Sequence, residues 1–202
     1  MRATHSHPSS WKFLPLGKLL HFERPIVSVD PMKTYQEMTL RLFGQGLVPR
    51  RTVLGSELTS GEVQRLSEGL FVTSIHQFRN GAVAVVPKEF DGSILSKNFL
   101  LFRPSIDTVL PAYLAHYLSS SRVVRFLQNN STGSATPIFP KHLMMRLEVP
   151  VPPLDDQIRL VRHLNELRQR INSLTQKVVY LEELIDRLKW ATYDSAFQAG
   201  VS

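Results

Sequence analysis

The last fifth of the chain shows the most regular pattern of apolar and polar positions. From residue 160 onward, apolar side chains recur at alternating steps of four and three residues. The positions are Leu160, Leu164, Leu167, Ile171, Leu174, Val178, Leu181, Ile185 and Leu188. This is the heptad spacing of a coiled coil, which places them all on one narrow face of a helix. A long helix with so narrow an apolar stripe cannot fold back into a compact core, so the pattern predicts a helix that pairs with another helix.

Local composition marks both ends of this helix. Three prolines within residues 149–153 exclude both a helix and a central strand there. Asp155 and Asp156 follow, where they can cap a helix N-terminus and complement its dipole. Helix-compatible sequence continues to Ala199, and Gly200 is a natural terminator. At ~1.5 Å per residue, the predicted helix is about 65 to 70 Å long.

The part before the prolines is predicted to be mostly strands. Polar and apolar residues alternate at 37–42, and short β-branched runs stand at 70–75 and 82–86, with further candidate strands at 94–102 and 146–151. One helix is expected from Pro111 to Leu127. The predicted fold class is therefore α+β: a small β-rich domain at residues 1–150, followed by a long coiled-coil helix at residues 151–202 that acts as a spacer and dimerisation element.

The charge is unevenly distributed between these two parts. The chain has a net charge of +7, and residues 1–150 hold 17 Lys/Arg against 10 Asp/Glu, whereas residues 151–202 hold 7 of each. A basic surface confined to one domain favours an anionic partner, nucleic acid first, although a moderately basic enzyme has the same balance. The chain has no cysteine, no apolar run long enough for a membrane span and no apolar stretch typical of a signal peptide, so we expect a cytoplasmic protein.

The motifs of the common catalytic sites are absent from the sequence. There is no glycine-rich phosphate loop, no Asn-Pro-Pro-aromatic motif of an adenine methyltransferase, no His-Glu-x-x-His, and no carboxylate followed by x-Lys in the first 150 residues. We therefore expect no catalytic residue, no metal ligand and no cofactor.

Polar and basic side chains between the predicted strands can instead hydrogen-bond base edges and phosphates. The candidate DNA-binding residues are Arg50, Arg51, Ser74, His76, Gln77, Arg79, Asn80, Lys97, Asn98, Ser131, Thr132, Ser134, Thr136 and Lys141. Any one of them could simply be a solvated loop residue, but their occurrence together in one basic domain favours DNA. We expect base or groove contacts from His76, Gln77 and Arg79. Phosphate contacts are expected from Arg50 and Arg51, placed in a loop after Pro49, and from Lys97 and Lys141.

An ordered series of segments resembles type I restriction-modification specificity subunits. The segments are residues 69–75, 78–83, 86–87, 92–99, 113–114, and 131–133 followed by Ile138. The most specific piece is residues 149–157, which is similar to the proline-rich strand that leads into the long helix of that family.

The resemblance implies a target recognition domain that reads double-stranded DNA, joined to a spacer helix and without catalytic activity of its own. It implies that methylation and cleavage belong to partner methyltransferase and restriction subunits. Such subunits usually hold two recognition domains and two spacer helices, whereas this chain has one of each. Met1 and the completed helix favour a half-subunit that forms a homodimer over a fragment. The family arrangement of the paired helices is antiparallel, although branched residues at one core position with leucine at the other favour a parallel pair.

Two other classes of protein fit part of the pattern. A transcriptional regulator that dimerises through a coiled coil would need a helix-turn-helix, for which residues 111–129 alone are available. A metal-dependent nuclease is the third possibility. A methyltransferase that co-purifies from the native host would favour the specificity subunit, and cleavage by the purified chain alone would favour the nuclease.

Overall fold

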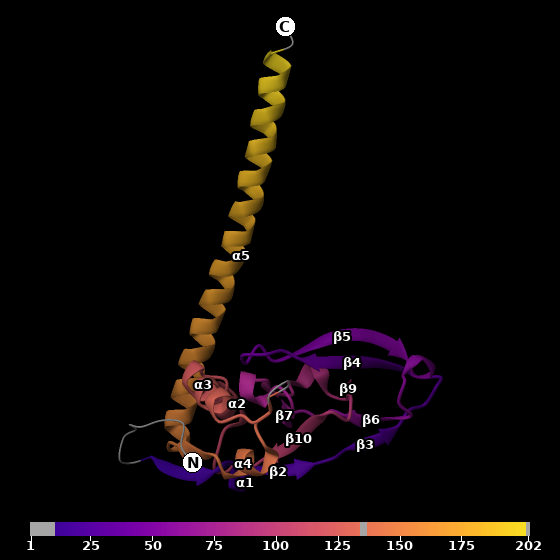
Figure 1. The fold of residues 1–202 in the computed structure, drawn as a ribbon, viewed down its shortest axis with the longest axis vertical. Helices are drawn as coiled ribbons and strands as arrows, with labels where there is room; N and C mark the ends of the chain where they lie inside the picture. Colours follow the sequence, from indigo (N-terminus) through magenta and orange to yellow (C-terminus); the bar gives the residue numbers. More distant parts are fainter. Residues whose placement is uncertain (1–10, 134–136, 201–202) are drawn as a thin grey trace. The chain divides into compact units, whose positions relative to one another are not determined.

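The computed structural model describes residues 11–133 and 137–200. The chain divides into two compact units, one reaching Val161 and the other beginning at Arg162. Among the described residues, all strands and the short helices belong to the first unit, and the second consists of helix (Figure 1). The prediction of an α+β fold with a β-rich domain and a long C-terminal helix is confirmed.

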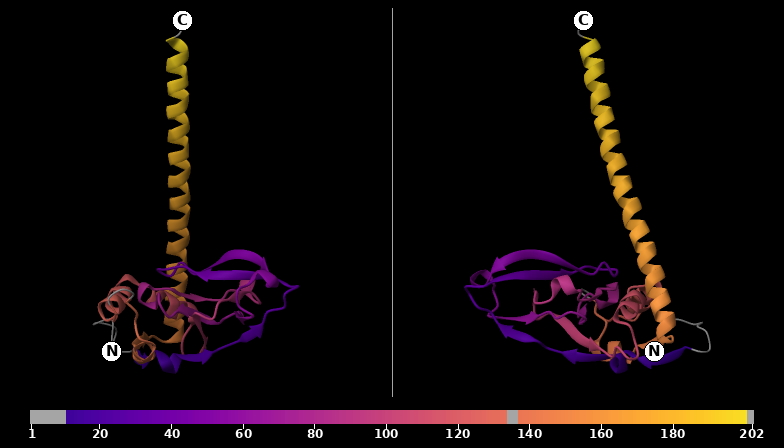
Figure 2. Two further views of the ribbon diagram at one scale, coloured as in Figure 1. Left: turned by 45° about the vertical axis from the view of Figure 1, so that its right-hand side comes forward. Right: turned by 180° about the vertical axis from the view of Figure 1, so that it is seen from behind.

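The described strands of the first unit form three sheets (Figure 2). The central sheet has the order β2 (Leu20–Glu23), β10 (Phe99–Pro104), β7 (Phe71–Ser74), β8 (Val83–Val85). The outer sheet has the order β3 (Ile26–Ser28), β6 (Glu62–Arg65), β9 (Ile94–Leu95), β4 (Thr34–Leu40), β5 (Leu47–Leu54). A two-stranded sheet pairs β1 (Lys12–Pro15) with β11 (Glu148–Val151), so the two ends of this unit meet.

Strands β7 and β8 and most of β10 are buried on both faces of the central sheet, which explains their nearly continuous apolar runs, whereas Phe22 of the edge strand β2 is 50% exposed. Alternate residues of its strands enter two different cores. Phe71, Val83, Leu100 and Phe102 point into the core on the helix side. Val72, Ala84 and Leu101 enter a second core, together with the outer-sheet residues Met38, Leu47 and Leu95. The unit is therefore layered as outer sheet, central sheet and helices.

The helix layer consists of α1 (Leu16–Leu19), α2 (Pro111–Leu118), α3 (Ser121–Asn129) and α4 (Lys141–Arg146). Tyr113 of α2 is buried and donates a hydrogen bond to the Pro150 carbonyl at 2.7 Å. Burial, with a smaller contribution from Tyr117, raises the pKa of Tyr113 well above its ordinary value. Its hydroxyl therefore stays protonated, so it can donate the hydrogen bond that joins α2 to β11.

Three sequence predictions need correction. The single helix expected from Pro111 to Leu127 is two helices, because the chain turns at Ser119 and Ser120 between α2 and α3. The single strand expected at residues 94–102 is two strands, β9 and β10, which lie in different sheets and are separated by a turn. The strand expected at residues 146–151 begins only at Glu148, since Arg146 ends α4.

The long helix α5 runs from Leu154 to Ala199, as predicted from the periodicity and from Gly200. It begins before the two aspartates, so Asp155 and Asp156 lie within its first turn, where they complement the dipole instead of capping it. The side chain of Gln157 is fully buried in the first unit. It accepts a hydrogen bond from the Leu110 amide at 2.7 Å and donates to two backbone carbonyls, of Thr108 at 3.1 Å and of Pro152 at 2.9 Å.

The apolar seam of α5 is exposed in the single chain. Ile171, Leu174 and Leu188 are 62%, 61% and 60% exposed. Exposed apolar residues in a regular row are a mark of an interaction face. Leu160, at the start of the predicted seam, differs because it packs against the helix-side core of the first unit.

Candidate nucleic-acid interface

A β-bulge places two arginines on one carboxylate. In the antiparallel pairing of β4 with β5, Glu37 is opposite Arg51 and the next residue, Met38, is opposite Pro49, so Arg50 is the extra residue. The side chain of Glu37 receives Arg51 Nε on Oε2 at 2.7 Å and Arg50 Nη1 on Oε1 at 3.2 Å. The arginines therefore lie in a strand, not in the loop expected from the sequence, and they are exposed although Glu37 is buried.

A second ion pair joins the turn between β9 and β10 to the start of β6. Lys97 Nζ is 3.2 Å from Glu62 Oε2, and both side chains are solvent-accessible. The buried side chain of Gln64 fixes this turn, because its Nε2 donates hydrogen bonds to the carbonyls of Ser96 and Phe99, each at 3.0 Å. Because these two hydrogen bonds anchor both ends of the turn, Lys97 and Asn98 are presented on a fixed piece of backbone.

The two pairs line one pocket of about 410 Å³. Its walls include Arg50 and Arg51 from β5, Lys97 and Asn98 from the β9–β10 turn, and Thr59 and Ser60 from the segment before β6. The structure thus brings together four of the predicted site residues, from two distant segments of the chain, because β9 lies between β6 and β4 in the outer sheet. We call this set of residues the basic pocket.

Three further candidates lie at the end of β7 and in the turn that follows it. Ser74 is paired with Phe99 in the central sheet, so the residues after Ser74 and those before Phe99 lie at the same end of that sheet. His76 and Gln77 follow Ser74 in an exposed turn. The register therefore places these two side chains at the same sheet end as Lys97 and Asn98.

Arg79 and Asn80 have contacts within the domain. Both lie in the 3-10 helix η2 (Phe78–Asn80) and are half-buried. Arg79 Nη1 is 3.5 Å from the Pro137 carbonyl. Asn80 donates to Gln77 Oε1 at 2.7 Å and accepts from Gln128 Nε2 at 2.9 Å, which ties η2 to α3. These contacts connect both residues to neighbouring segments of the domain.

The remaining candidates are spread over other parts of the domain. Ser131 donates to the Leu127 carbonyl at the end of α3, and Thr132 pairs with Ile138 in an isolated bridge. Ser134 and Thr136 lie outside the described residues. The Lys141 ammonium is 4.0 Å from the ring centroid of Phe22. Lys141 is the first residue of α4. In Figure 1, α4 lies on the side of the domain away from β4 and β5.

Sequence reasoning missed the residues that position the basic pocket. Glu37 and Gln64 are polar residues within strands, and that is the only signal they carry in the sequence. Their roles depend on strand register and on the strand order of the outer sheet, which are not local properties of the sequence.

Within residues 11–133 and 137–200, no group of three or more His, Asp or Glu side chains is arranged to hold a metal ion. No helix in this part of the chain is both long and apolar enough to cross a membrane.

Solved structures share this fold. The HsdS subunit from Thermoanaerobacter tengcongensis matches with a TM-score of 0.65 and 20% identity over 85% of this chain and 45% of that one. A structure on complex assembly and conformational transition of the type I R-M system matches with a TM-score of 0.67 and 20% identity, over 86% and 46%. The type I S subunit from M. genitalium has a TM-score of 0.55 and 9% identity, over 86% and 43%. This chain thus spans less than half the length of each of these relatives.

The family assignment rests on the sequence as well as on the fold. No curated protein sequence matches the chain. A family model described as the type I restriction modification DNA specificity domain matches residues 61–183, more than half of the chain, from the start of β6 well into α5. The resemblance found in the sequence is therefore confirmed: the chain belongs to the family of type I restriction-modification DNA specificity domains.

Proposed function

We propose that this chain recognises a DNA sequence within a type I restriction-modification complex and directs methyltransferase and restriction subunits to that site. The chain itself is then not an enzyme. The observation that carries the proposal is the basic pocket within a chain of this family, because it gathers arginine, lysine and hydroxyl side chains on one surface of the domain. Because the DNA of the host is the substrate, the cytoplasm is the proposed location.

The proposal divides the work between the two parts of the chain. Residues 1–150 contact DNA, and the helix in residues 151–202 pairs with the helix of a second copy and binds the methyltransferase subunit. Support for pairing comes from the exposed seam between Leu167 and Leu188, since a row of apolar side chains every three and four residues is buried only by another helix. The pair is proposed to be antiparallel, which separates the two recognition domains.

Methylation in the native host tests this function. Deleting the gene for this chain should abolish adenine methylation at one defined motif, and the 202-residue chain supplied in trans should restore it. The purified chain alone, given duplex DNA with Mg²⁺ and a methyl donor, should neither cleave nor methylate. Unchanged methylation after deletion would contradict the proposal, and cleavage by the purified chain would favour a nuclease instead.

A further inference from the structure

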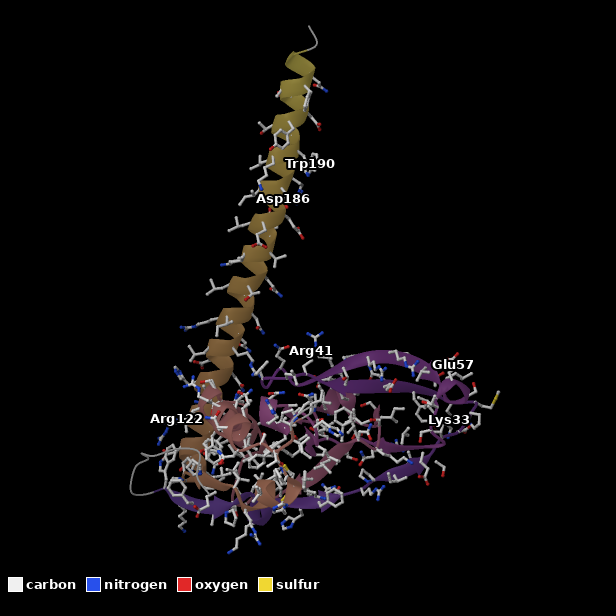
Figure 3. All side chains as sticks on the ribbon, viewed as in Figure 1. Lys33, Arg41, Glu57, Arg122, Asp186 and Trp190 are labelled. Carbon is white, nitrogen blue, oxygen red and sulfur yellow. The ribbon has the colours of Figure 1, made fainter. Side chains whose placement is uncertain are left out.

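The ribbon formed by β4 and β5 is joined to the rest of the outer sheet at a single residue pair. β4 pairs with β5 along its whole length, but its pairing with β9 is limited to Glu37 opposite Ile94. β5 is the edge strand of this sheet. Figure 3 shows Arg41 near one end of the ribbon and Lys33 and Glu57 at the other. A two-stranded antiparallel ribbon of this kind fits the major groove of B-form DNA.

The exposed side chains of β5 include the two arginines at the bulge. Arg50, Arg51 and Thr52 are consecutive exposed residues of the edge strand. The Arg50 and Arg51 side chains are 61% and 48% exposed, whereas that of Glu37 is 11% exposed. The carboxylate thus lies beneath the arginines, which are the groups that a ligand would meet.

The two arginines bind Glu37 through different nitrogen atoms, so different donors remain available on each. Arg51 binds the carboxylate through Nε, and its terminal Nη1 and Nη2 make no hydrogen bond with the part of the chain that the structure describes. Arg50 binds through Nη1, one of its two terminal nitrogens. Bidentate recognition of guanine O6 and N7 needs two N–H donors on neighbouring nitrogen atoms of one guanidinium group. Arg51 can supply them from Nη1 and Nη2, while its Nε bond to Glu37 already fixes the side chain.

The carboxylate also favours a base over a phosphate as the ligand of Arg51. Together with Arg50 and Arg51, Glu37 gives a cluster with a net charge of +1 instead of the +2 of the two arginines alone, so the carboxylate weakens the attraction of a phosphate to this site. The O6 and N7 atoms of guanine are neutral acceptors, so their binding depends less on the net charge. We propose that Arg51 reads a guanine in the major groove and that Glu37 is the residue that positions it. This inference rests on the proposed DNA recognition, and it changes the role expected for Arg51 from phosphate contact to base contact.

Selection of bound duplexes from a random-sequence library tests the inference. The 202-residue chain should select a motif with a guanine in each half-site. Arg51→Ala should lose the preference for that guanine by about 5- to 150-fold, the range of a good bidentate pair. Glu37→Gln, which keeps the shape of the side chain and removes its charge, should weaken the same preference. Arg103→Ala is the matched control, because Arg103 is also a strand arginine paired with a glutamate, Glu23, and the selected motif should not change.

A modified base links Arg51 to one atom of the DNA. Replacing the selected guanine by 7-deazaguanine removes N7, so the wild-type chain should lose affinity for the site and Arg51→Ala should not lose any more. Arg51→Ala that binds all sequences more weakly but keeps the motif would assign Arg51 to phosphate and overturn the inference. A wild-type motif without guanine would overturn it as well. If the wild-type chain selects no motif, the proposed function fails together with it.

Discussion

The buried side chain of Gln157 offers a direct test of how the start of α5 is held. Replacing it by methionine keeps the length of the side chain and removes all three hydrogen bonds. The Leu110 amide and the carbonyls of Thr108 and Pro152 then lose a partner inside the domain. Each unsatisfied buried group costs about 1 to 3 kcal/mol, and the carbonyls less than the amide because each has a second lone pair.

We therefore expect Gln157→Met to lower the free energy of unfolding by about 2 to 4 kcal/mol. For a chain of this size the corresponding fall in Tm is about 4 to 16 °C. Calorimetry at fixed protein concentration is the suitable assay, since circular dichroism would be dominated by the long helix. Gln176→Met, at an exposed position of α5, is the control and should change Tm little.

A charged variant adds a dependence on pH with a defined sign. In Gln157→Glu the carboxylate would face two carbonyls in a buried site, so its pKa in the folded protein should rise above the unfolded value of about 4.3. The folded state then binds more protons, and the loss of stability should grow as the pH rises above that value. Equal melting of Gln157→Met and the wild type at all pH values would refute the argument.

Three further predictions concern the helix, the interface and a turn. Leu174→Asp would bury an unpaired carboxylate in the helix pair, so light scattering should show a dimer for the wild type and a monomer for the variant. With about four to six phosphate contacts per copy, the slope of log affinity against log salt should be about −3.6 to −5.4 per copy. Lys97→Ala should reduce its magnitude by about one, whereas Lys141→Ala, whose ammonium lies on Phe22, should leave it unchanged. A Cβ on Gly55 would lie 2.0 Å from the Asp30 carbonyl oxygen, so Gly55→Ala should lower Tm, while Gly61→Ala, with nothing within 4 Å, should not.

The sequence predicted those parts of the fold that depend on local patterns. The helix from Leu154 to Ala199 was predictable because its periodicity and its terminator are properties of neighbouring residues. The turns that divide α2 from α3 and β9 from β10 were missed, although polar residues interrupt the apolar runs at 119–122 and 96–98. A short polar stretch inside such a run does not by itself reveal that the chain turns or that the next strand joins a different sheet.

The candidate site was predictable in residue type but not in arrangement. The sequence predicts Arg50 and Lys97 as phosphate contacts because both are basic, Arg50 in the segment after Pro49 and Lys97 within residues 94–102, and both line the basic pocket. That they share a pocket depends on strand order, and that two arginines meet Glu37 depends on a bulge that shifts the register by one residue. Neither the strand order nor the bulge follows from hydrophobic periodicity.

Equilibrium binding at physiological salt tests the central claim most directly. The duplex would carry the motif methylated in the native host, and its competitor would be the same bases in scrambled order. Two copies related by a two-fold axis should bind an interrupted palindrome. The account predicts that the dimer binds this site at least about 1,000-fold more tightly than the scrambled duplex. Equal affinity for the two duplexes would contradict it.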